Sequence, residues 1–103
     1  MNQTLKQLDL LRELAKAGVD DSMMKLTTRK LLEYEIQKHE ASLEKLAQDL
    51  AEFEEKYQMR SELFFKRFEK GELGDAMDFV EWASLYQMFK RIEYRKEMLT
   101  HGI

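Results

Sequence analysis

The strongest hydrophobic pattern in the chain is a row of positions spaced alternately four and three residues apart. This is the spacing of the a and d positions of a heptad repeat, which lie on one face of an α-helix. One polar residue, His39, interrupts the otherwise apolar series. The series is Leu32, Ile36, His39, Leu43, Leu46, Leu50, Phe53 and Tyr57. It predicts a long amphipathic helix over residues 21–58, with a seam that another helix must cover.

Charges beside the seam indicate which helix covers it. In a parallel homodimer, Glu35 would face Glu40 of the second chain and Asp49 would face Glu54, and both contacts are repulsive. The apolar segment 75–99 becomes basic toward its end, and an antiparallel return brings that end toward the acidic start of the long helix. The residues so paired are Lys90, Arg91, Arg95 and Lys96 with Glu33, Glu35 and Glu40. An intramolecular hairpin is the preferred interpretation, and a seam filled by a second copy is the alternative.

A shorter helix is predicted over residues 4–17, before the long one. Its apolar stripe has helical spacing and consists of Leu5, Leu8, Leu11 and Leu14. Thr4 and Gln7 have the spacing of a capping box, and Gly18 supplies a residue suited to a helix end. Because so short a helix is marginal alone, we expect it to fold back on the long helix. A free partner-binding helix is the alternative.

Two further helices complete the predicted fold. Ser61 is expected to cap a short helix over residues 61–70, and Gly71 to end it. Asp75 is expected to cap a C-terminal helix over residues 75–99. The predicted fold class is therefore all-α: a long antiparallel helical hairpin or coiled coil with short N-terminal and linker helices, forming one domain over residues 1–103.

Composition supports long helices and narrows the classes of function. The chain of 103 residues has no proline and four glycines, so helix breakers are few. The absence of cysteine excludes disulfides and thiolate metal sites. No signal peptide or apolar span is recognisable, so we expect a cytoplasmic protein without membrane contact. A net charge of −3 argues against a dedicated nucleic-acid binder. The basic cluster Lys25, Arg29 and Lys30 is interpreted as an ordinary charged helix start.

Candidate chemistry is sparse. His39 and His101 are the only histidines. Glu35 lies one turn from His39, but two ligands do not make a metal site. The chain has no glycine-rich phosphate loop, nucleophile elbow or metalloprotease motif. The sequence therefore predicts no enzyme, no metal and no cofactor.

Aromatic residues concentrate in the second half of the chain, since all except Tyr34 lie between Phe53 and Tyr94. Acidic residues accompany them, namely Glu69, Glu72, Asp75, Asp78 and Glu81. One interpretation is a core where two helices and their linker converge. The other is a binding surface in which aromatic anchors are surrounded by negative charge, which suits a basic partner.

Segment 53–94 resembles a family of small helical proteins identified as antitoxins of bacterial and archaeal toxin–antitoxin pairs. The similar phrases are Lys56-Tyr57-Gln58-Met59, Phe65-Lys66-Arg67-Phe68-Glu69-Lys70-Gly71-Glu72-Leu73-Gly74-Asp75 and Asp78-Phe79-Val80-Glu81-Trp82. The resemblance implies a protein that binds and neutralises a cognate toxin. The implied partner-binding residues are Phe79 and Trp82 as anchors, with Glu72, Asp75, Asp78 and Glu81 meeting basic groups of the toxin. The competing hypothesis is a self-assembling coiled-coil scaffold or adaptor, a homo-oligomer without a toxin partner.

Overall fold

Four α-helices make up the part of the chain that the computed structural model describes, which is residues 3–16, 18 and 21–102. They are α1 (Gln3–Lys16), α2 (Asp21–Tyr57), α3 (Ser61–Glu69) and α4 (Met77–His101), and the described residues include no strand. The predicted all-α class is confirmed. None of these helices combines the length and apolar character that crossing a membrane requires.

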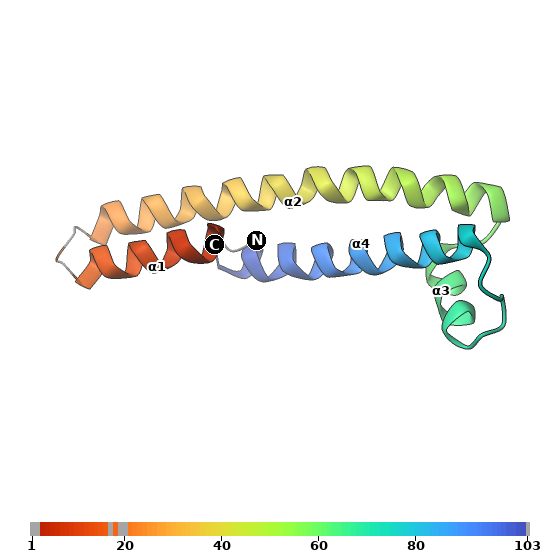
Figure 1. Ribbon diagram of the computed structural model, residues 1–103. Helices are drawn as coiled ribbons and strands as arrows, with labels where there is room; N and C mark the ends of the chain where they lie inside the picture. The colour runs from red at the N-terminus through yellow and green to blue at the C-terminus, as the bar shows by residue number, and fades with distance from the viewer. Residues whose placement is uncertain (1–2, 17, 19–20, 103) are drawn as a thin grey trace.

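The long helix α2 is the spine of an elongated molecule measuring 58 × 21 × 18 Å. Figure 1 shows α4 returning antiparallel along the later part of α2, while α1 lies antiparallel along its beginning. The two covering helices meet beside the first third of α2, where Gly102 lies against the side chain of Leu32. The short helix α3 sits at the end of the hairpin where the chain turns back. The predicted intramolecular hairpin is therefore confirmed.

Every member of the predicted seam faces inward. Leu32, Leu46 and Leu50 are buried, and the other five positions, His39 included, are half-buried. The ridge is covered by helices of the same chain, so no second copy is needed to shield it from water.

Ion pairs agree with the antiparallel register. Lys96 Nζ lies 3.3 Å from Glu40 Oε2, which joins the basic end of α4 to α2 as predicted. Glu35 behaves differently, because its buried carboxylate lies 3.5 Å from Lys38 Nζ of its own helix. The pair between Lys96 and Glu40 is close to solvent, so it stabilises the fold weakly and mainly favours one register of α4 along α2.

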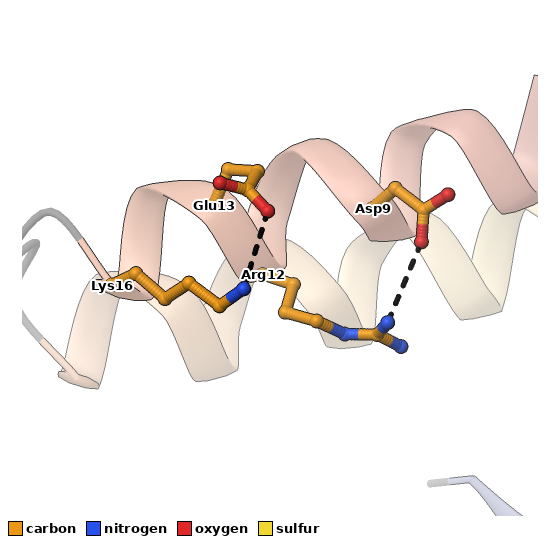
Figure 2. A network of polar contacts seen from close by, with 4 residues as sticks. All are labelled: Asp9, Arg12, Glu13 and Lys16. Atoms are coloured by element: carbon orange, nitrogen blue, oxygen red, sulfur yellow. Dashed lines mark hydrogen bonds and ion pairs between the residues drawn. The ribbon is translucent and has the colours of Figure 1, made fainter.

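The N-terminal helix α1 folds back on α2, as predicted. Leu11 is buried and Leu8 half-buried, but Leu5 is exposed, so the predicted stripe does not bury this residue. Figure 2 shows the polar face of α1, where Arg12 pairs with Asp9 at 3.7 Å and Lys16 with Glu13 at 3.4 Å. The side chains of Thr4 and Leu14, to which the prediction also assigned roles, lie outside the described part.

The predicted N-caps are wrong, whereas the predicted end of α3 is confirmed. Ser61 is the first residue within α3, and Arg60 occupies the cap position without a side-chain cap. Ala76 occupies the cap position of α4 in place of Asp75. Gly71 has φ +75°, and the amides of Gly71 and Glu72 donate to the carbonyls of Phe68 and Arg67. This pair of hydrogen bonds is a Schellman motif, which needs a left-handed residue where Gly71 stands.

The end of α2 uses a less suitable residue in the same conformation. Gln58 has φ +51°, and the Met59 amide after it donates to the Glu54 carbonyl at 3.2 Å. A left-handed conformation costs an L-residue about 1–2 kcal/mol, whereas glycine adopts it freely. The fold imposes this cost at the turn out of α2.

We therefore predict that Gln58→Gly raises the free energy of unfolding by about 0.5–1 kcal/mol, after the greater entropy of glycine in the unfolded chain is included. Gln58→Ala is the control. Like the glycine variant, it loses the hydrogen bond from Gln58 Nε2 to the Glu55 carbonyl, but it keeps the cost of the left-handed conformation. Urea unfolding followed by circular dichroism measures both. A glycine variant less stable than the alanine variant would contradict the assignment.

Candidate functional site

Trp82 lies at the centre of the core where α2, α3 and α4 converge. Its side chain is 0% exposed. The indole stacks on Phe64, with ring centroids 3.8 Å apart and an interplanar angle of 4°, and it is flanked by Phe53 and Tyr57. The residue expected to anchor a partner is therefore inside the chain's own core, out of reach while the three helices stay packed.

A chain of hydrogen bonds fixes Trp82 and joins the three helices. Trp82 Nε1 donates to Ser61 Oγ at 2.9 Å, and Ser61 Oγ donates to Glu54 Oε2 at 2.7 Å. The Ser61 amide donates to the same carboxylate oxygen at 2.9 Å. Glu54 thus places a negative charge at the N-terminus of α3, where free amides and the helix dipole favour it. The Glu54 carboxylate, which belongs to α2, therefore caps the N-terminus of α3, the role predicted for Ser61.

A groove of about 330 Å³ lies between α2 and α4 beside this core. Phe53 and Leu85 are its apolar lining residues. Its charged residues are Asp49, Glu52 and Lys56 from α2, and Asp78 and Glu81 from α4. Four carboxylates therefore line the groove with one ammonium group, and Lys45 lies 3.9 Å from one of them, Asp49.

Asp78 is the most constrained carboxylate in the groove. Its Oδ2 accepts hydrogen bonds from Lys56 Nζ, at 2.7 Å, and from the Tyr57 hydroxyl. The bond from Lys56, followed by that from Tyr57, lowers the pKa of Asp78 below its ordinary value. The same contacts with Asp78 raise the pKa of Lys56 and that of the Tyr57 phenol. The charged form of Asp78 is therefore the one that joins the start of α4 to α2.

The structure separates the six residues expected to bind a partner. Asp78 and Glu81 line the groove, and Trp82 is buried. Phe79 is half-buried and packs edge-on against Tyr57, with centroids 5.2 Å apart. The remaining two, Glu72 and Asp75, are exposed on the segment between α3 and α4 and are not among the groove residues.

Sequence reasoning missed the α2 side of the groove. Asp49 was assigned to the flank of a coiled coil, and Glu52 to no site. Their spacing with Lys56, three and then four residues, does place all three on one face of α2. This spacing does not reveal where α4 lies along α2, and α4 is the helix that brings Glu81 to the same groove.

Metal binding finds no support in the described residues. They contain no group of three or more histidine, cysteine, aspartate or glutamate side chains that could hold an ion. His39 Nδ1 lies 2.8 Å from the Glu35 carbonyl oxygen of the preceding turn, so the ring is tied to its own helix.

No family model, no curated protein and no solved structure matches the chain. The resemblance to antitoxins therefore rests on the residues of segment 53–94 alone. A function must be inferred from the chemistry of the surfaces, and the groove is where four carboxylates gather around apolar side chains.

The hydrogen-bond chain predicts a large effect of a small change. Ser61→Ala leaves the buried Trp82 Nε1 without its acceptor and removes one of the two hydrogen bonds to the Glu54 carboxylate, which keeps the bond from the backbone amide of residue 61. We expect the free energy of unfolding to fall by about 1–3 kcal/mol. Ser42→Ala, on the exposed side of α2, is the matched control and should change it by less than about 0.5 kcal/mol. Urea titration followed by the fluorescence of Trp82, the only tryptophan, measures both, and equal stabilities would contradict the role of Ser61.

The ion pair between Lys56 and Asp78 predicts how the pKa of Asp78 responds to a substitution of Lys56. Lys56→Met removes the main cause of the low pKa of Asp78, so this pKa should rise toward its ordinary value, as measured by NMR of the carboxyl carbon. Because the folded-state pKa lies below the unfolded value of about 3.9, the contact contributes stability above that pH. This contribution is lost as the pH falls through the folded-state pKa. Lys45→Met, whose lysine pairs with Asp49 at 3.9 Å, should leave the pKa of Asp78 unchanged.

Proposed function

We propose that the chain is a protein–protein interaction module that binds a basic segment of a partner protein in the groove between α2 and α4. The observation that carries the proposal is the set of four carboxylates from two helices around the apolar side chains of Phe53 and Leu85. Lysine and arginine combine an apolar stem with a cationic head, so one such side chain can use both features of the groove.

Lys56 illustrates this chemistry within the chain itself. Its ammonium nitrogen lies 2.7 Å from Asp78 Oδ2 and 5.4 Å from the centroid of the Tyr57 ring. The groove therefore already holds one alkylammonium group beside an aromatic ring and a carboxylate. Glu52 and Glu81 supply the charge for additional cations from a partner, as does Asp49 beside its exposed pair with Lys45.

Together with the family resemblance, this chemistry favours the role of an antitoxin. In the proposal, the groove takes basic groups of a cognate toxin that otherwise hold RNA or a nucleotide. Binding neutralises the toxin by occupying those groups and requires no catalysis by this chain. Both proteins act in the cytoplasm. Complementary charge mainly accelerates and orients such an association.

A scaffold assembled through the α2 seam is the competing function. The hairpin covers this seam with α4, so such a scaffold requires the hairpin to open. Trp82 is already buried within a single chain. Tryptophan fluorescence that is shielded from solvent would therefore not distinguish a self-assembled scaffold from a monomer.

The groove predicts a charge-specific loss of binding. The probe is the product of the neighbouring gene, co-expressed and then titrated against the purified chain by calorimetry and stopped flow. Glu52→Lys combined with Glu81→Lys should weaken binding by at least about tenfold, mostly through slower association, and the difference should shrink at high salt.

The matched control is Glu13→Lys combined with Glu44→Lys, which changes the net charge equally at exposed positions away from the groove. It should bind nearly as well as the wild type. Equal weakening by both pairs would reduce the effect to net charge and reject the groove. No binding by the wild type would reject the neighbouring product as the toxin.

A further inference from the structure

The outward face of α4 carries a second heptad pattern that the chain does not cover. Seven positions recur at spacings of four, three, four, three, four and three, and all seven are exposed. They are Met77, Glu81, Ser84, Met88, Arg91, Arg95 and Met98. The three methionines lie at the two ends and in the middle: Met77 is 81% exposed, Met88 39% and Met98 58%. We call these positions the outer stripe. Methionine adapts easily to a packing partner, so three on one free stripe suit an interface.

Charge along the outer stripe changes sign from one end to the other. Glu81 lies in its first half, whereas Arg91 and Arg95 lie in its second. A parallel neighbour of the same sequence would place glutamate against glutamate and arginine against arginine, which is repulsive. An antiparallel neighbour of the same sequence places opposite charges together. The stripe is therefore complementary to itself in one orientation only.

We propose that two copies of the chain associate through this stripe, with their α4 helices antiparallel about a two-fold axis. In an antiparallel coil, a positions of one helix lie beside d positions of the other. The register centred between Ser84 and Met88 then sets each Met88 over the small Ser84 of the second copy. It also sets Glu81 of each copy beside Arg91 of the other, so the attractive pair occurs twice.

The size of the outer stripe indicates how tightly the two copies should bind. From Met77 to Met98 the stripe spans about 31 Å, and each copy contributes one helix face. This is at the small end of specific interfaces, so a dissociation constant on the order of micromolar is expected. The two-fold arrangement closes on itself and stops at two copies.

Sedimentation equilibrium over a range of protein concentrations tests the association. The wild type should rise from the monomer mass of 12.4 kDa to twice that value. Met88→Lys, which sets two ammonium groups near the axis, should raise the dissociation constant by at least about tenfold. Gln48→Lys, on the exposed side of α2, adds the same charge and should leave it unchanged. A wild type that stays at 12.4 kDa into the millimolar range overturns the proposal.

The charge pair gives a sharper test of the register. Arg91→Glu should weaken the dimer, because the introduced carboxylate would repel Glu81 of the second copy. Combining it with Glu81→Arg should restore most of the affinity. Failure of this rescue, with both variants retaining wild-type helicity by circular dichroism, overturns the antiparallel pairing of these residues.

Because the chain has no cysteine, single cysteines report the orientation directly. Met77→Cys mixed with Met98→Cys should give a cross-linked heterodimer with a short bismaleimide. Each variant alone should cross-link little, because its own equivalent lies at least about 27 Å away along an antiparallel pair. Strong cross-linking of each variant to itself, with none in the mixture beyond statistics, indicates a parallel pair and overturns the proposal.

Discussion

The fold depends on one constraint, the need to remove a continuous apolar ridge of α2 from water. The ridge runs from Leu32 to Tyr57, and no single returning helix covers the whole of α2. The chain covers the ridge with α4 and the beginning of α2, before the ridge, with α1; the division lies near Leu32 and Gly102. Because the hairpin folds back only once, each long helix keeps one face in solvent. The surfaces exposed to partners thus include the groove along the seam between α2 and α4 and the outer side of α4.

The convergence of three helices at the end of the hairpin determines how α4 meets α2. Trp82 is fixed by stacking on Phe64 and by its hydrogen bond to Ser61, which Glu54 holds in turn. Asp78 lies one turn before Trp82, so fixing the indole also directs this carboxylate toward Lys56 of α2. The polar groove is in this sense a consequence of the aromatic core.

Sequence periodicity predicted what is local, and it missed what depends on the rotation of one helix against another. The spacing of the seam was enough to predict α2 and its covering helix, and Gly71 marked a helix end because few other residues adopt its conformation. The predicted start of α3 at Ser61 is right, but its cap was misassigned because the acceptor for the Ser61 amide is Glu54, seven residues earlier and across a turn. From the sequence, Trp82 could be either a core residue or a partner-binding anchor. Only the packing of the three helices shows that it is buried in the core. The joining of Asp49 and Glu52 with Glu81 likewise requires the position of α4.

Glu81 belongs both to the groove and to the outer stripe, so the two proposed interactions are coupled. In the proposed dimer, Arg91 of the second copy neutralises Glu81 and removes one of the four carboxylates that attract a basic partner. A partner that takes Glu81 of one copy for its own cation removes one of the two attractive pairs of the dimer contact. By mass action, a ligand that binds the monomer better than the dimer shifts the equilibrium toward the monomer. Self-association through α4 would then hold the acidic groove partly neutralised until a stronger cationic partner competes for the same carboxylate.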